Sequence, residues 1–316
     1  MGRNTGEEGF LSSMIAKLLR RYYFPRSLGN NAYSKLPKAE IGKRLSSLDL
    51  LVVDIDDTIA PHYTVGIANR IFIDYFFRCF FGAAYKGIGK IETTKDALKI
   101  VFRSFARKRW RLSKEKRHWR TLASLATAGT YMYLCRFVRN GSNFLGFWHI
   151  SNEHLIKRFI SVMKRNNIHF RGYFYSKQEL KRSLYPGVQE LFLGTKKLNP
   201  RLEILCMSQS FSEKNGGVHA YASLIPCSSF HSNRVKCKED GSITSEELSI
   251  PNAKAKRKIV ERQKCKQGSI GILANEYEDR ELIGMPNVTL CILNNAPVAL
   301  WKKGHVLIDK DYGGLC

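Results

Sequence analysis

The chain has 316 residues, a length that allows one large domain with an insert, or two domains. Its hydrophobic residues make up 44% of the sequence, which argues against a disordered protein. Lysine and arginine number 52 against 27 aspartates and glutamates, so the formal net charge is +25. The excess predicts attraction to polyanions, whether nucleic acid, anionic lipid headgroups or phosphorylated substrates, without choosing among them.

Residues 1–47 are predicted to form a basic N-terminal extension with one short amphipathic helix. Apolar side chains recur at helical spacing over 10–22, beside Lys17, Arg20 and Arg21. The stripe is interpreted either as a helix docked on the protein or as an interfacial helix on an anionic membrane. No secretory signal is visible and the cysteines include no Cys-x-x-Cys pair, so we expect a cytoplasmic protein, with peripheral membrane association as the alternative.

The next stretch, 48–58, reads Leu-Asp-Leu-Leu-Val-Val-Asp-Ile-Asp-Asp-Thr. Its apolar run 50–53 predicts a strand buried on both faces. Asp54 and Asp56 follow that run, and residues two apart in an extended segment point the same way. Two carboxylates at such a short distance repel each other unless a cation, a proton or a bound group separates them. We therefore expect a ligand site at the carboxyl end of this strand.

From 62 to 183 the sequence predicts several helices, because residues 94–164 alternate basic and apolar side chains with few glycines and no proline. The apolar run 122–138 is marginal in length for crossing a bilayer and favours a buried helix. The basic stretch 103–120, with two tryptophans interleaved, is interpreted either as a solvated helix face or as a patch that binds nucleic acid or anionic lipid.

After residue 184, strands and helices alternate, which predicts an α/β fold with a Rossmann-like parallel sheet and helices on both faces. Predicted helices cover 185–197, 253–264 and 297–303; predicted strands cover 202–207, 221–230, 269–274, 288–293 and 305–308. Polar clusters follow three of the buried strands, and a lysine-rich helix lies between the second and the third. Together they predict one site at the carboxyl edge of the sheet, where carboxylates bind a divalent cation and hydroxyl and ammonium groups donate to a phosphate.

The strand followed by Asp-Ile-Asp-Asp-Thr at 54–58 resembles the first motif, Asp-x-Asp-x-Thr, of the haloacid dehalogenase (HAD) superfamily of phosphohydrolases. Within that superfamily the chain is most similar to the phosphoserine-phosphatase-like group, which has a helical cap inserted after the first motif. The strand that ends at Ser208 resembles the second motif. Lys254, early in a helix, best fits the lone lysine of the third motif, with Lys256 as a rival.

The fourth motif of the superfamily, Gly-Asp-x-x-x-Asp, is matched only in part. Asp279 is present, but Ala274 replaces the glycine and Asn275 replaces the first aspartate. An amide oxygen can still bind Mg²⁺, but the replacement removes one negative charge. We expect weaker metal binding unless another acid contributes; the candidates are Glu276, Glu278 and Asp57.

The resemblance implies a Mg²⁺-dependent phosphatase or phosphotransferase that acts on a phosphate monoester through an aspartyl-phosphate. It implies a HAD-like core formed by 48–61 and 184–316, with 62–183 as a mainly α-helical cap. The implied roles are Asp54 as nucleophile and Asp56 as general acid/base, with Thr58, Ser208 and Lys254 as phosphate ligands. The implied metal ligands are the Asp54 side chain, the Asp56 backbone carbonyl, Asn275 and Asp279. The expected partner is a phosphorylated small molecule, and no obligate protein partner is inferred.

Two other functions stay open. One is a catalytically weakened HAD-fold protein that binds nucleic acid or an anionic membrane, which Asn275 and the +25 charge favour. The other is a membrane-associated lipid phosphatase that uses 10–22 or the aromatic segment 67–81. A zinc site is a weaker hypothesis, because the histidines and cysteines concerned are irregularly spaced; they are His219, Cys227, His231 and Cys237.

Overall fold

The computed structural model describes residues 17–29, 31–81, 114–127, 152–213, 216–263 and 268–315. The predicted N-terminal helix is described only from residue 17 and spans 17–23, so its first part lies outside the described residues. Most of the basic stretch 103–120 and of the apolar run 122–138 also lies outside them, although 116–127 is helical as predicted. None of the described helices combines the length and the apolar character needed to cross a bilayer.

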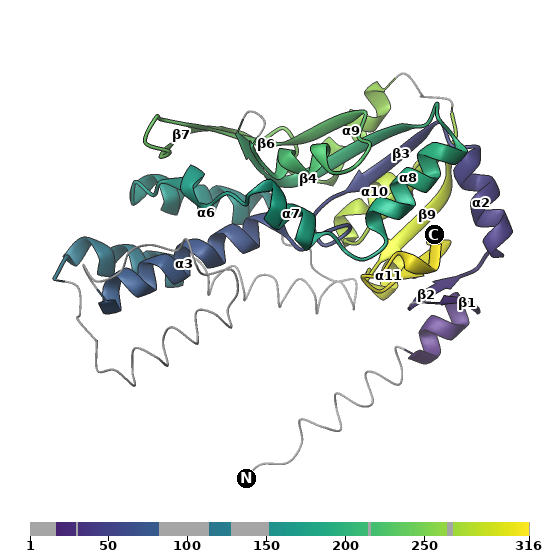
Figure 1. Ribbon diagram of the computed structural model, residues 1–316, viewed down its shortest axis with the longest axis horizontal. Helices are drawn as coiled ribbons and strands as arrows, with labels where there is room; N and C mark the ends of the chain where they lie inside the picture. Colours follow the sequence, from purple (N-terminus) through teal and green to yellow (C-terminus); the bar gives the residue numbers. More distant parts are fainter. Residues whose placement is uncertain are drawn as a thin grey trace, which may run out of the picture.

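In the described part of the chain, ten strands form one mixed sheet (Figure 1). They are β1 (Arg26–Gly29), β2 (Ala32–Ser34), β3 (Leu50–Asp54), β4 (Glu203–Glu213), β5 (Gly216–Gly217), β6 (Ser229–Cys237), β7 (Ile243–Glu247), β8 (Ile270–Ala274), β9 (Val288–Asn294) and β10 (Val306–Ile308). Their order in the sheet is β1-β2-β10-β9-β8-β3-β4-β6-β7, and β5 pairs with β4. The strand expected from the run 50–53 therefore lies in the middle of the sheet.

The six inner strands, from β10 to β6, all run parallel. Antiparallel strands flank them: the β1–β2 hairpin pairs with β10, and β7 pairs with β6. In register, Asp54 on β3 lies beside Met207 on β4, and Val53 lies beside Leu273 on β8. The carboxyl ends of these three strands consequently meet at one edge.

The sheet is covered on both faces because its central strands are apolar in both directions. Successive side chains of a strand point to opposite faces. In β3, Leu51 and Val53 belong to one hydrophobic cluster, which includes side chains of α2 (Lys38–Ser46) and α8 (Val188–Leu198). Leu50 and Val52 belong to the other cluster, on the opposite face. Helices α9 (Ala253–Arg262), α10 (Arg280–Ile283) and α11 (Val298–Trp301) contribute to that second cluster.

The described residues of the segment 62–183 are mainly helical. It contains α3 (Tyr63–Phe81), the helix 116–127, α6 (Asn152–Arg165), the 3₁₀ turn η2 (Phe170–Tyr173) and α7 (Lys177–Ser183). Tyr75 and Phe80 of α3 contact His118 and Trp119 edge-on, and Thr121 donates to the Asn166 side chain over 3.1 Å. These contacts join α3, 116–127 and the end of α6. The division of the chain into core and cap stays a prediction.

The α/β class and most of the predicted elements of the sheet are confirmed. The strands expected at 202–207, 269–274, 288–293 and 305–308 correspond to β4, β8, β9 and β10, and the three expected helices correspond to α8, α9 and α11. The strand expected at 221–230 is wrong. Residues 218–223 instead form the 3₁₀ turn η3 (Val218–Ser223), and β6 begins only at Ser229. Pro226, which has no N–H for a strand ladder, lies in the turn between them.

Candidate active site

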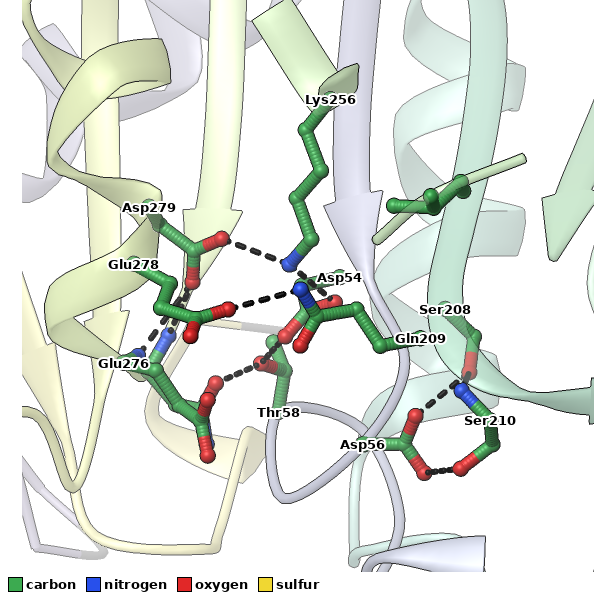
Figure 2. Close-up of polar contacts among 12 residues, drawn as sticks. Asp54, Asp56, Thr58, Ser208, Gln209, Ser210, Lys256, Glu276, Glu278 and Asp279 are labelled. Atoms are coloured by element: carbon green, nitrogen blue, oxygen red, sulfur yellow. Dashed lines mark hydrogen bonds and ion pairs between the residues drawn. The ribbon is translucent and has the colours of Figure 1, made fainter. Parts of the chain in front are cut away.

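The polar residues expected at the carboxyl edge of the sheet come together there, and they are buried (Figure 2). Asp54 ends β3, Ser208 lies within β4, and Asn275 directly follows β8. Asp54 and Asp56 are only 4% and 5% exposed, and Ser208 and Asp279 are not exposed at all. A cluster of carboxylates this deep is costly unless counter-charges and hydrogen-bond donors surround it.

Lys256 supplies the counter-charge at the centre of the cluster. Its Nζ lies 2.8 Å from Asp54 Oδ1 and 2.8 Å from Asp279 Oδ1, and its side chain is 2% exposed. Burial lowers the pKa of Lys256, but the carboxylates of Asp279 and Asp54 outweigh this, so its pKa lies above the ordinary value. Lys256 is therefore a permanent cation between two acids that are far apart in sequence.

The sequence prediction of Lys254 as the site lysine is wrong, because Lys254 is exposed on α9. The side chains of Ala253, Lys256 and Val260 are the buried ones on this helix. They lie three and four residues apart, which is the spacing of one helix face. Lys254 is about 100° away from Ala253 around the helix axis, since one turn takes 3.6 residues. Lys256, the rival residue, takes the position in the site.

Thr58 and Asn275 lie on the other side of Asp54. The Thr58 hydroxyl is 3.0 Å from Asn275 Oδ1 and 3.5 Å from Asp54 Oδ2. Burial raises the pKa of Asp54 well above its ordinary value, with the carboxylates of Asp279 and Asp56 adding to the rise and the Lys256 ammonium opposing it. The ammonium is thus the group that favours the ionised, nucleophilic form of Asp54.

The carboxylate of Asp56 is held by three donors. Its Oδ1 accepts hydrogen bonds from the backbone N–H of Tyr63 and the hydroxyl of Ser210, both over 2.8 Å. Its Oδ2 accepts a short hydrogen bond from the hydroxyl of Ser208, which itself accepts from the Ser210 N–H over 2.9 Å. The imidazole Nδ1 of His62 lies 3.5 Å from Asp56 Oδ1. Ser208, expected as a phosphate ligand, is thus at the site, with its hydroxyl directed at Asp56.

A second polar pair crosses the site between β4 and the 3₁₀ turn η4 (Tyr277–Asp279). Gln209 Nε2 donates to Glu278 Oε2 over 2.7 Å, and Figure 2 shows this contact beside the one between Lys256 and Asp54. Gln209 is 6% exposed and Glu278 is 1% exposed. Glu278, one of the three acids considered to compensate for Asn275, is therefore buried within the cluster.

The set of four predicted metal ligands stays a prediction. The Asp279 carboxylate accepts from Lys256 and, through Oδ2, from the backbone N–H groups of Asn275 and Glu276. The expected ligand of Asp56 is its backbone carbonyl, and the contacts of its carboxylate with Ser208 and Ser210 do not test that expectation. Within the described ranges, no group of three or more His, Cys, Asp or Glu side chains is arranged to hold a metal, and the zinc hypothesis gains no support.

Two oxygens nevertheless fit Mg²⁺ in their chemistry. Asp54 Oδ2 and Asn275 Oδ1 both approach the Thr58 hydroxyl, one as a carboxylate oxygen and the other as an amide oxygen. Mg²⁺ prefers oxygen ligands and usually keeps several waters beside one or two carboxylates. A small donor set of this kind is compatible with that preference.

Sequence reasoning did not assign roles to several residues that the structure brings to the site. Gln209 and Ser210 were visible as a polar run after a strand, and Tyr63 contributes only its backbone N–H. Asn294 and Tyr312 both contact the carbonyl of Thr58. No sequence motif connects these two with Thr58, since the contacts arise only when β9 and residues 309–315 come to lie beside the loop after β3.

No protein-family model and no curated protein sequence matches the chain. Among solved structures, a phospho-aspartyl intermediate analogue of phosphoserine phosphatase is 13% identical, with a TM-score of 0.46, and the match covers 84% of this chain and 95% of the other. A phosphoserine phosphohydrolase-like protein from Francisella tularensis is 15% identical, with a TM-score of 0.45, and the match covers 85% and 98%. An HAD family hydrolase from Salmonella enterica is 13% identical, with a TM-score of 0.42, and the match covers 83% and 67%. The solved structures to which this chain is similar thus include phosphoserine phosphatases and HAD-family hydrolases.

Proposed function

We propose that this protein is a Mg²⁺-dependent phosphohydrolase that cleaves a phosphate monoester through an aspartyl-phosphate on Asp54. The observation that carries the proposal is the buried ammonium of Lys256, held 2.8 Å from both Asp54 and Asp279 at the carboxyl edge of a parallel sheet. A carboxylate nucleophile needs a nearby cation, because the phosphate that it attacks is itself negatively charged. The Asp-x-Asp-x-Thr sequence after β3 supports the same chemistry.

In the first half of the reaction, an oxygen of Asp54 attacks phosphorus and the bond from phosphorus to the ester oxygen breaks. Asp56, in its protonated form, gives its proton to the departing oxygen, so an alcohol leaves and the phosphoryl group stays on Asp54. Lys256 and the Thr58 hydroxyl are suitably charged or polar to donate to the phosphoryl oxygens. Ser208 and Ser210 keep the Asp56 carboxyl in place through their hydrogen bonds.

In the second half, a water molecule attacks phosphorus and the bond to Asp54 breaks. Asp56, now a carboxylate, takes the proton of that water, and inorganic phosphate leaves. The two halves return Asp54 and Asp56 to their starting protonation states. Asp54 and Asn275, with the backbone carbonyl of Asp56, would hold Mg²⁺, which when bound offsets the repulsion between the attacking carboxylate and the phosphate.

Hydrolysis of p-nitrophenyl phosphate with millimolar Mg²⁺ tests the proposal. We expect turnover by the wild-type chain, loss of turnover in EDTA, and a loss of about a thousandfold or more in kcat for Asp54→Asn, because the amide is not a nucleophile. Mass spectrometry of acid-quenched enzyme should find the phosphoryl group on the peptide that contains Asp54. Turnover by Asp54→Asn at the wild-type rate would refute the nucleophile assignment.

Asn275 favours a second candidate, a protein of this fold that has lost strong metal binding and acts as a polyanion-binding module. The amide removes one charge from the site, and the chain carries a net charge of +25. This alternative predicts no Mg²⁺ binding at millimolar concentration, together with binding to nucleic acid or anionic vesicles that weakens steeply with salt. Measured Mg²⁺-dependent turnover would exclude it as the main function.

A further inference from the structure

Residues 309–315, far along the chain from β3, lie against the loop that carries the proposed catalytic residues. The side chain of Tyr312 is fully buried, and its hydroxyl donates a hydrogen bond of 2.7 Å to the backbone carbonyl of Thr58. Its backbone N–H donates to the carbonyl of Pro186 over 2.7 Å, just before α8 begins. Tyr312 therefore joins the start of α8 to the loop after β3.

Asn294 holds the same carbonyl from a different element. It ends β9 and is fully buried, and its Nδ2 donates to Thr58 O over 2.5 Å and to Asp57 O over 3.3 Å. Its Oδ1 accepts from the backbone N–H of Lys310 over 2.8 Å. The carbonyl of Thr58 thus accepts from two buried side chains, and one of them is itself fixed by the segment 309–315.

This segment packs closely against the backbone of its neighbours. A Cβ on Gly187, whose φ is +76°, would lie 2.5 Å from the backbone nitrogen of Gly313. A Cβ on Gly314 would lie 2.6 Å from the carbonyl oxygen of Gly29, at the end of β1. The segment therefore passes between the start of α8 and the N-terminal hairpin with backbones in close contact on both sides. These close contacts support Tyr312.

The loop that it supports needs such a support. Asp57 has a φ of +55°, a left-handed conformation that persists in a residue other than glycine only where the surrounding structure holds it. The next residue, Thr58, directs its hydroxyl at Asp54 (Figure 2). The same hydroxyl also donates to Asn275 Oδ1. A shift of the Thr58 backbone would move that hydroxyl away from the nucleophile.

We infer that Tyr312 and Asn294 are positioning residues for the reaction, and that they act by fixing the carbonyl of Thr58 so that its hydroxyl stays beside Asp54. The inference rests on the proposed function. Both side chains donate to the backbone carbonyl of Thr58, so the effect that we infer passes through the loop. The segment 309–315 is accordingly a part of the catalytic architecture.

Tyr312→Phe tests this, because it removes the hydroxyl and keeps the buried ring. With p-nitrophenyl phosphate and Mg²⁺, we expect kcat to fall by about 10- to 100-fold, as a small misplacement of a reacting group can cost that much. We expect KM to stay within about twofold of wild type, since the lost interaction acts in the transition state. Inhibition by orthovanadate, which mimics the trigonal phosphoryl group, should weaken in parallel with kcat.

Tyr173→Phe is the matched control. It also removes a buried tyrosine hydroxyl, which donates to Asp74 over 2.6 Å away from the proposed catalytic residues. The control should lose thermal stability with kcat and vanadate inhibition unchanged, so a loss of kcat in Tyr312→Phe cannot be attributed to destabilisation alone. Should Tyr312→Phe give no folded protein, Asn294→Ala removes the other donor and the same fall in kcat is expected.

The outcomes separate this inference from the proposed function. A wild-type chain with turnover and a Tyr312→Phe variant with unchanged kcat would overturn the inference and leave the proposed function standing. A rise in KM at constant kcat would also overturn it. If the wild-type chain showed no turnover and formed no phosphoryl group on Asp54, both the proposed function and this inference would be overturned.

Discussion

Lys256 is the residue on which the charge balance of the buried site depends. Removing a partner from a buried ion pair leaves an uncompensated charge, which typically costs about 3–5 kcal/mol. We therefore expect Lys256→Met to lower the free energy of unfolding by about this amount, because Asp54 and Asp279 would face each other without the ammonium. Urea denaturation followed by circular dichroism measures it.

Lys254→Met is the control for that experiment, because Lys254 lies two residues away on the same helix and is exposed. Its effect should stay within about 0.5 kcal/mol, as is usual for surface substitutions. Equal denaturation midpoints for the two variants would contradict the assignment of Lys256 as the central cation. Loss of p-nitrophenyl phosphate turnover is likewise expected only for Lys256→Met.

Asn275 can be tested by restoring the charge that its amide lacks. We expect Asn275→Asp to bind Mg²⁺ roughly tenfold more tightly than wild type, since metal affinity at oxygen sites rises with the number of charged ligands. Without Mg²⁺ the variant should unfold more easily, because the added carboxylate lies among other buried acids. Isothermal titration with MgCl₂ and thermal melts measure the two effects.

Asn295, the exposed residue that follows β9, provides the control for this experiment. Asn295→Asp makes the same change of charge outside the site, at an exposed position. Its Mg²⁺ affinity should equal that of wild type. If both variants bound Mg²⁺ equally, Asn275 would not be a metal ligand.

The choice between Lys254 and Lys256 illustrates what sequence reasoning could have found at this scale. The motif allowed both lysines, but the spacing of Ala253, Lys256 and Val260 already placed Lys256 on the face of the helix that packs against the sheet. The positions of Asp54 and Asp56 followed from the strand and the motif. The hydrogen bonds from Ser210 and Gln209 could not be predicted, since they depend on side-chain directions at the end of β4.

At the scale of single elements, α8 offers a direct comparison of two glycines. Gly187 precedes the helix with a φ of +76° and contacts Gly313, whereas Gly194 lies within the helix with open space around it. We expect Gly187→Ala to lower the free energy of unfolding by about 1–3 kcal/mol, because of backbone strain and the close contact with Gly313. Gly194→Ala should stabilise the protein by about 0.5–1 kcal/mol, because alanine is the better helix former.

Thermal melts measure this: the melting temperature should fall in Gly187→Ala and rise in Gly194→Ala. A Gly187→Ala variant as stable as wild type would show that residues 309–315 are not packed tightly against the start of α8. A destabilising Gly194→Ala would contradict the exposed, unhindered position of that glycine.

Whether the prediction of a strand was confirmed depended on how the residues of that strand are buried. The parallel strands β3, β8 and β9 are apolar on both faces, so a simple apolar run identified them. Strand β6 lies towards the side of the sheet and carries histidine, asparagine, arginine and lysine, so no apolar run revealed its extent. The hairpin strands β1 and β2 are short and depend on pairing with β10, which a local pattern cannot predict.

For the molecule as a whole, three histidines make stability depend on pH. Burial lowers the pKa of His219, His231 and His305 below the ordinary value of 6.5, and nearby cationic side chains lower it further. As the pH falls through 6.5, the unfolded chain takes up these protons before the folded chain does. Stability from these groups is therefore full above pH 6.5 and is lost as the pH falls towards the folded pKa values.

His305→Asn isolates one of these contributions. His305 Nδ1 accepts a hydrogen bond of 3.0 Å from the Cys291 N–H, which a protonated imidazole could not accept. An asparagine oxygen can accept the same bond without titrating. We expect a smaller loss of unfolding free energy between pH 7.5 and 5.5 in the variant than in wild type, measured by urea denaturation; an identical loss would contradict the prediction.

The pairing of β2 with β10 has a consequence for how the protein is made. Ser34, in β2, donates to the carbonyl of His305, which is 271 residues further along the chain. On the ribosome, β2 can pair with β1 early, but its pairing with β10 waits until nearly all of the described sequence has been synthesised. Such distant pairings slow folding and leave strand edges unprotected in the meantime. The nascent chain should accordingly need chaperone protection until residues 306–308 have left the exit tunnel.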